Sequence, residues 1–326
     1  MSLPVAPAAP SRFLVAAALL SLYLIWGSTY LATKVALTAW PPLLLSSVRY
    51  LLAGGVQYAV MRFSGSPAPS RQDWFRASVV GFCLLLFGNG GTTFSQQYIP
   101  SGLAALMVAS VPMFLALMGW ASGITPRPTA KVTGGLVLGM VGMYLLASNR
   151  TATAVLYPGH HLLGVGLVLM AAFMWSVGSL YSKKNPTSGS PFVGVGMQML
   201  CGGVFLGIAG LLHGEATQVN VSAISPKAWG AFVYLVTFGS WVAFSAYIWL
   251  LRVVEPALAG TYAFVNPAVA VLLGWAFGGE ALNLQMGSGA VLIVVAVMLV
   301  VLGGRRPNRA SPAGYASVSD AELSSK

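Results

Sequence analysis

The second half of this 326-residue chain repeats the first. When Ser101–Trp120 is aligned with Pro256–Trp275 at a constant offset of 155, six of the twenty residue pairs are identical. A fold for this chain therefore has to accommodate two related units. Three further identical pairs extend the repeat, the first at an offset of 155 and the others at 149: Trp74 with Trp229, Trp26 with Trp175, and Lys34 with Lys183.

Both units are strongly apolar. Hydrophobic residues make up 57% of the chain and charged residues only 7%, against about 25% charged in ordinary soluble domains. The apolar runs are continuous and about 20 residues long, which is the length of a transmembrane helix and excludes a barrel of short alternating strands. The ten predicted spans lie near 13–33, 43–61, 77–95, 103–121, 132–148, 162–181, 192–212, 229–251, 257–278 and 286–304.

The basic residues predict how these spans are oriented. If the N-terminus is cytoplasmic, thirteen of the seventeen lysines and arginines fall in cytoplasmic segments and three fall outside. Five spans per unit is an odd number, so the second unit enters the membrane upside down relative to the first. The sequence therefore predicts an all-α membrane protein of ten transmembrane helices in two inverted five-helix repeats.

The same positions divide the chain into five parts. A polar connection joins the two repeats, and the C-terminal tail has a composition typical of disorder. The predicted parts are a cytoplasmic N-terminal segment at 1–12, a first repeat at 13–148, an external connection at 149–161, a second repeat at 162–304 and a cytoplasmic tail at 305–326.

Two prolines occupy equivalent places in the repeats. Pro112 and Pro267 lie about ten residues into their predicted helices, where each removes a backbone donor. Such a proline makes either a packing kink or a hinge whose freed carbonyl lines a cavity. The repeat relation, and Asn266 next to the second proline, favour the hinge.

Several aromatic and amide side chains lie at mid-membrane depth. Trp26 and Trp175 are repeat-related, so lining a shared cavity is weighed equally with ordinary core packing. Asn89 lies among glycines in the sequence Gly-Asn-Gly-Gly, which would leave its amide open to a cavity. Interhelical hydrogen bonding is the alternative for Asn89 and Asn266. We expect these four residues and Tyr262 to face one central substrate cavity.

Arg49 is the one cation well inside a predicted helix, about 9 Å from its outer end. An arginine at this depth costs about 2.5–3.5 kcal/mol on insertion scales, so it is expected to snorkel, pair or bind a ligand. Glu280, at the outer end of the ninth span, is the predicted partner. An anionic or zwitterionic substrate that displaces Glu280 would make the pair an outer gate.

Small residues recur at the spacing of close helix contacts. Gly135 with Gly139, and Gly203 with Gly207, fit the small-xxx-small pattern of packed membrane helices. We assign these glycines a structural role.

Four local strings have a familiar pattern: Trp26-Gly-Ser-Thr-Tyr-Leu-Ala-Thr-Lys34, Arg49-Tyr-Leu-Leu-Ala53, Pro100-Ser-Gly-Leu-Ala-Ala-Leu106, and Thr261 to Trp275 followed by Gly279-Glu280. Together they resemble the EamA-domain family of the drug/metabolite transporter superfamily, and specifically its YedA-like branch. The resemblance covers nearly the whole span from Phe13 to Gly304 and implies a central cavity and the export or exchange of metabolites, amino acids or drugs.

One departure bears on energy coupling. Many relatives carry acidic residues near the outer end of the third helix and at the end of the fourth, where this chain has Phe94-Ser-Gln-Gln-Tyr98 and Gly119-Trp-Ala-Ser-Gly-Ile124. The absence of these carboxylates puts proton coupling through the first repeat in doubt.

The sequence thus predicts a carrier of a small organic solute in the inner (plasma) membrane, with both termini cytoplasmic. Apart from the solute, membrane lipid and a possible second copy of the chain are the expected partners; nucleic acid is not. No nucleotide-binding motif or metal-ligand spacing is present, so no cofactor is expected. A lipid-carrier flippase is the main alternative. An intramembrane enzyme is less favoured, because the helices hold no paired aspartates or midplane histidine.

Overall fold

The computed structural model describes residues 11–99, 104, 107–147, 160–219, 224–278 and 284–303. All regular structure in these ranges is helical, as predicted. Glu280, most of the predicted connection and the C-terminal tail lie outside the described residues. Within them, six segments are long and apolar enough to cross a membrane: Arg12–Ala36, Pro42–Phe63, Arg71–Ser95, Leu162–Lys184, Pro191–Leu212 and Pro226–Val253.

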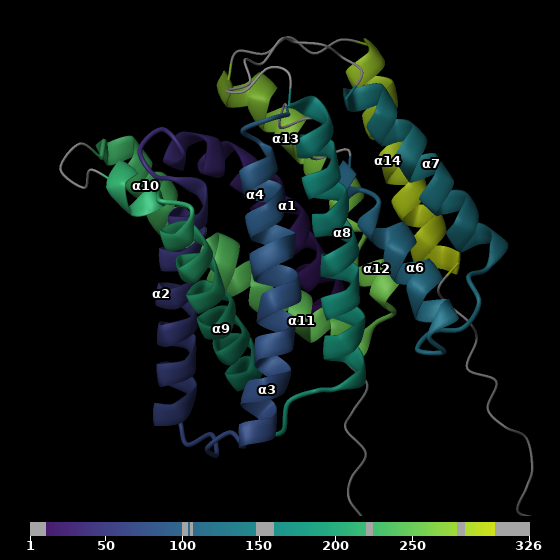
Figure 1. The fold of residues 1–326 in the computed structure, drawn as a ribbon. Helices are drawn as coiled ribbons and strands as arrows, with labels where there is room; N and C mark the ends of the chain where they lie inside the picture. The colour runs from purple at the N-terminus through teal and green to yellow at the C-terminus, as the bar shows by residue number, and fades with distance from the viewer. Residues whose placement is uncertain are drawn as a thin grey trace, which may run out of the picture.

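The elements follow the order of the two predicted repeats (Figure 1). In the first, they are α1 (Arg12–Ala36), α2 (Pro42–Phe63), α3 (Arg71–Val80), the π-helical η1 (Gly81–Gly90), α4 (Gly91–Ser95), α6 (Val111–Ala121) and α7 (Ala130–Ala147). In the second, they are α8 (His161–Lys184), α9 (Pro191–Leu212), the 3₁₀ turn η2 (Glu215–Gln218), α10 (Pro226–Tyr234), the π-helical η4 (Leu235–Val242), α11 (Ala243–Val253), α12 (Pro256–Ala259), α13 (Tyr262–Gly278) and α14 (Leu284–Gly303).

The third long helix of each repeat contains a π-helical stretch in its middle. At the offset of 155, η4 corresponds to residues 80–87 and so overlaps η1 at 81–90. A π-helical stretch shifts the backbone hydrogen-bond register and is common at functional sites. Neither stretch was predicted from the sequence.

Two helix pairs form the periphery of the bundle. α2 packs along α9, and α7 packs along α14, where the two lie side by side at one edge (Figure 1). A Cβ at Gly54 would lie 2.9 Å from the carbonyl oxygen of Gly196, and a Cβ at Gly135 would lie 2.9 Å from that of Ala296. Glycine is therefore required for these backbones to approach so closely.

The predicted glycine contacts lie at helix interfaces. A Cβ at Gly203 would meet the backbone nitrogen of Leu51 at 3.0 Å, and one at Gly139 would meet the ring of Phe264 at the same distance. Gly207 faces Ser47 of α2. Side-chain volume at these positions would separate the helices.

Two buried carboxylates fasten the ends of the α2–α9 pair, and each is only 1% exposed. Asp73 accepts hydrogen bonds from the backbone N–H and the hydroxyl of Ser188, just before α9, and completes a capping box with Ser70. Glu215 accepts from the N–H groups of Leu43 and Leu44 at the start of α2. Each carboxylate thereby satisfies donors at a helix N-terminus.

The interior contacts between the repeats are reciprocal. α1 packs against α13 and the α10–α11 helix of the second repeat. α8, the repeat equivalent of α1, packs against α6 and the α3–α4 helix of the first repeat. α1 and α8 thus occupy the centre of the bundle.

The two prolines differ in their surroundings. The fourth helix of the first repeat is interrupted by a turn at Ala109 and Ser110, so Pro112 lies in the first turn of α6 and not ten residues into a helix. Proline is tolerated there because the first N–H groups of a helix have no intrahelical partner. Pro267 does lie inside a helix, α13, but as its sixth residue, because the ninth span is also interrupted by a turn, at Gly260 and Thr261.

Candidate functional site

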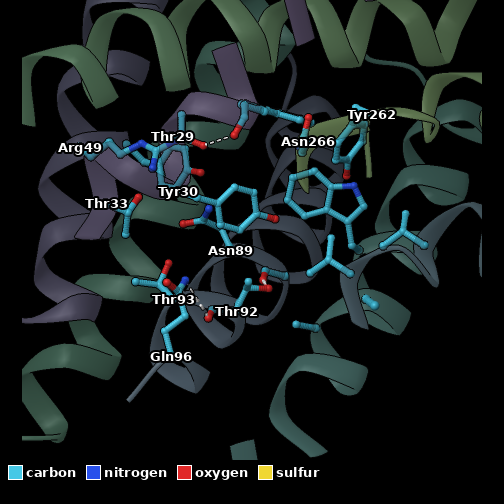
Figure 2. Close-up of a pocket in the computed structure, with 18 residues that line it drawn as sticks. Thr29, Tyr30, Thr33, Arg49, Asn89, Thr92, Thr93, Gln96, Tyr262 and Asn266 are labelled. Carbon is cyan, nitrogen blue, oxygen red and sulfur yellow. Dashed lines mark hydrogen bonds between the residues drawn. The ribbon is translucent and has the colours of Figure 1, made fainter. Parts of the chain in front are cut away.

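An open cavity lies among the central helices (Figure 2); its empty volume, which includes the space at its open mouth, is about 710 Å³. Both repeats contribute to it, and all six residues predicted to bind substrate line it. The lining residues are Trp26, Thr29, Tyr30 and Thr33 of α1; Arg49 and Tyr50 of α2; Gly88, Asn89, Thr92, Thr93 and Gln96 of η1, α4 and its C-cap; Val108 and Val111; Ala171, Ala172 and Trp175 of α8; and Tyr262 and Asn266 of α13.

Helical periodicity explains the two polar walls. Trp26, Tyr30 and Thr33 recur at i, i+4 and i+7, which places them on one face of α1. On the opposite wall, Asn89, Thr92, Thr93 and Gln96 recur at i, i+3, i+4 and i+7. Figure 2 shows Tyr30 and Asn89 among the side chains that line the cavity. The cavity therefore separates α1 from η1 and α4.

Four aromatic rings form one end of the cavity and the core beneath it. The Trp26 ring centroid lies 4.6 Å from that of Tyr262, 5.3 Å from that of Tyr247 and 5.7 Å from that of Trp175. Tyr247 is fully buried, and its hydroxyl accepts from Trp175 Nε1 at 2.9 Å and bonds Ser179 Oγ at 2.7 Å. Edge-on packing of this kind closes the bundle below the cavity.

The π-helical η4 orients two predicted site residues. Its Gly239 carbonyl accepts from Trp26 Nε1 at 3.0 Å, and its Ser240 hydroxyl accepts from Arg49 Nε at 2.5 Å. A Cβ at Gly239 would lie 3.2 Å from Arg49 Nη2, so the glycine leaves room for the guanidinium. Arg49 Cζ also lies 4.9 Å from the centre of the Tyr50 ring.

Arg49 therefore has polar and aromatic partners at the cavity wall. It is 6% exposed, and within the described residues it forms no salt bridge. Its predicted partner Glu280 lies outside the described residues, so the outer gate formed by this pair stays a prediction. The guanidinium presents buried positive charge to the cavity.

Two amides of the wall have unsatisfied oxygens. The Oδ1 atoms of Asn89 and Asn266 are buried, and neither has a hydrogen-bond partner in the described structure. Asn266 is only 2% exposed. A buried acceptor without a partner is costly, by about 1–3 kcal/mol, unless a ligand or water satisfies it. Both amides are therefore suited to contact a bound solute.

The opposite end of the bundle is closed by polar contacts. Tyr23 of α1 bonds Thr261 at 2.7 Å, beyond the aromatic rings. Lys183 Nζ donates to the carbonyls of Leu251 and Val254 at 2.9 and 2.8 Å, which caps the C-terminal end of α11. Among the described residues, these bonds and the aromatic rings fill the bundle on this side of the cavity.

Sequence reasoning missed several residues of this site. Tyr247 and Ser240 lie in an apolar stretch without a local motif, and only the tertiary contacts of η4 and α11 place them beside Trp175 and Arg49. Tyr30 and Thr92 were also missed. Their helical spacing relative to Trp26 and Asn89 was a signal that could have identified them.

The model of the EamA-like transporter family matches residues 13–148 and again residues 162–302. The chain belongs to this family. The two matches begin with α1 and α8, the helices at the centre of the bundle.

Curated relatives agree with the family. The inner membrane transporter YedA of Escherichia coli K12 is 38% identical over 287 residues, which cover 88% of this chain and 90% of that protein. A probable amino-acid metabolite efflux pump of Salmonella typhimurium is 26% identical and covers 86% and 92%. A solved structure with 20% identity has a TM-score of 0.74 and covers 91% of this chain and 99% of that one, which shows a shared fold.

These findings confirm the resemblance to the YedA-like branch. They identify this EamA protein as a multi-pass transporter of the inner membrane. The homologues are transporters and not enzymes.

Proposed function

We propose that this protein exports a small organic solute by alternating access between two inverted five-helix repeats. The observation that carries the proposal is the open cavity lined by both repeats, with the rings of Trp26, Trp175 and Tyr247 packed against one another at one end. Three features support the inverted repeat: the reciprocal packing of α1 and α8, the π-helical stretch in the third helix of each repeat, and the buried carboxylates Asp73 and Glu215. Ten helices and cytoplasmic termini belong to the same proposal.

The polar groups of the cavity suit a particular type of solute. Arg49 offers a positive charge for an anionic or zwitterionic group, and the amide oxygens of Asn89 and Asn266 accept hydrogen bonds. The rings of Trp26, Trp175 and Tyr262 offer an apolar surface for the rest of the molecule. A metabolite that carries a carboxylate, a hydrogen-bond donor and an apolar group satisfies all three requirements.

Export is the proposed direction. The positive-inside bias assigns the closed, lysine-capped end of the bundle to the cytoplasm, so the described structure is open to the outside. The direction rests on the Salmonella relative, which is named a probable amino-acid metabolite efflux pump. Pro112 and Pro267 are the proposed hinges.

A toxicity screen followed by vesicle transport tests the proposal. Cells that overproduce the protein should tolerate one class of solute better than cells that lack it. Purified protein in vesicles should then move that solute. Scrambling of a fluorescent lipid without solute movement would replace the proposal with the flippase alternative.

A further inference from the structure

The closed end of the bundle is held by three side chains of α8. Trp175 Nε1 and Ser179 Oγ both bond the Tyr247 hydroxyl, at 2.9 and 2.7 Å. One turn further, Lys183 donates to the carbonyls of Leu251 and Val254. Together these bonds join α8 to the C-terminal half of the α10–α11 helix. We call this set the inner latch.

Each member of the inner latch has a repeat equivalent at the open end. At the offset of 149, the α8 residues correspond to Trp26, Tyr30 and Lys34 of α1. At the offset of 155, the acceptors correspond to Thr92, Gln96 and Ile99 on the α4 side of the cavity. Ser179 of α8 thus corresponds to Tyr30 of α1, and Tyr247 of α11 corresponds to Thr92 of α4. Each pair contains one tyrosine and one smaller hydroxyl residue, on opposite helices in the two repeats.

The equivalent residues are present but are not joined in the described structure. Tyr30 and Thr92 line opposite walls of the cavity (Figure 2), and Thr92 donates to the Gly88 carbonyl of its own helix at 2.7 Å. Trp26 donates to Gly239 instead. Lys34 is exposed and has no hydrogen bond from its side chain within the described residues.

We propose that Trp26, Tyr30 and Lys34 form an outer latch with Thr92, Gln96 and Ile99 when the transporter opens to the cytoplasm. Tyr30 and the Trp26 indole then bond the Thr92 hydroxyl, and Lys34 caps the carbonyls of Gln96 and Ile99. This inference rests on the proposed alternating access, since an inverted repeat can interconvert by exchanging the conformations of its halves.

The exchange of conformations between the repeats also predicts a new position for the Trp175 indole. The repeat equivalent of the Gly239 carbonyl is that of Leu84, and both belong to the π-helical stretches. When the inner latch opens, Trp175 Nε1 is expected to leave Tyr247 and donate to Leu84. Each tryptophan thus alternates between a latch hydroxyl and a π-helical carbonyl.

A single cysteine in the cavity tests the latch. The probe is Val108→Cys, in a background that also carries Cys83→Ser and Cys201→Ser. It is labelled in vesicles by a membrane-impermeant maleimide added from the cavity side. Tyr247→Phe and Lys183→Gln weaken the inner latch and should lower the labelling rate. Tyr30→Phe and Lys34→Gln weaken the outer latch and should raise it.

The size of each change follows from one lost hydrogen bond. A net loss of that kind shifts the ratio of the two states by about 2- to 10-fold. The increase in labelling rate expected for the outer-latch variants is measured in the Tyr247→Phe background. In that background a larger fraction of the molecules is already open to the cytoplasm. There, Tyr30→Phe and Thr92→Val should each restore labelling, and combining them should add little because they remove the same bond.

The controls separate the latch from general structural effects. Tyr144→Phe, on the exposed side of α7, and Thr237→Val, a half-buried threonine of η4 whose hydroxyl donates to the Val233 carbonyl of its own helix, should leave labelling unchanged. If the inner variants lower labelling while the outer variants do nothing, the outer latch is wrong and alternating access survives. The same maleimide is also added from the opposite side of the membrane. If no variant becomes labelled from that side, alternating access itself is wrong.

Discussion

The helix pairs at the periphery and the helices around the cavity place their buried polar groups in different surroundings. In the α2–α9 pair, glycines bring the backbones together, and at its two ends Asp73 and Glu215 accept hydrogen bonds from neighbouring helix starts. Both regions contain buried amide oxygens without a hydrogen-bond partner in the described structure: Gln57 and Gln198 in the pair, and Asn89 and Asn266 around the cavity. Only the two asparagines line the open cavity, where a bound solute can satisfy them. The comparison therefore assigns rigidity to the periphery and binding to the centre.

The largest expected effect comes from separating the peripheral pair. Gly54→Leu would force a side chain onto the backbone of Gly196 and Leu200, and we expect a loss at the upper end of the overpacking range, about 3 kcal/mol. Folded protein in the membrane should fall sharply. Gly55→Leu is the matched control, because the nearest atom to a Cβ there is a side-chain carbon of Leu200 at 4.0 Å. Equal losses for both variants would contradict close backbone packing.

At the centre, the same comparison predicts lost transport without lost stability. Asn266→Ala removes an acceptor that has no partner in the described structure, so thermal stability should stay the same or rise. Transport should fall about tenfold or more, since one hydrogen bond to a solute of about 1.4 kcal/mol is lost. Gln218→Ala, an exposed amide outside the cavity, should change neither quantity. A variant that transports like the parent would remove Asn266 from the site.

Substitution of the buried carboxylates Asp73 and Glu215 should have the reverse effect, a loss of stability without a loss of solute affinity. Asp73→Asn loses the charge that accepts from Ser70 and Ser188, and we expect a decrease of about 2 kcal/mol in the free energy of unfolding. The midpoint of thermal unfolding in detergent measures it. Glu215→Gln should give a similar decrease at the other end of the pair. The solute affinity of the protein that remains folded should be unchanged in both.

The smallest predicted effects concern the prolines. Pro267→Ala restores an N–H inside α13, which should stiffen the helix and slow transport a few-fold. Pro112→Ala should do less, because Pro112 lies in the first turn of α6. Initial transport rates, normalised to protein in the membrane, measure both. A larger effect at Pro112 would reverse the assignment of the two hinges.

The sequence predicted the parts of the site that follow from periodicity and duplication. Apolar length and the repeat indicated membrane helices, and depth within them selected Trp26, Trp175 and Asn266, which line the cavity. The π-helical stretches could not be predicted, because no local motif marks a shift in backbone register. Ser240 and Tyr247 were missed for the same reason, since their roles depend on which side of η4 and α11 faces the centre. The turn before Pro112 was also missed, as the apolar pattern runs through it without interruption.

Solute counterflow in vesicles is the most direct test of the central claim that the cavity is the transport site. The vesicles contain the unlabelled solute identified by the toxicity screen, and entry of the labelled solute is followed. The account predicts rapid counterflow with the parent protein and with Arg71→Gln, which changes an exposed arginine at the start of α3. Arg49→Gln, which changes the buried arginine of the cavity, should abolish it while the protein remains folded. Counterflow by Arg49→Gln at the parent rate would contradict the account.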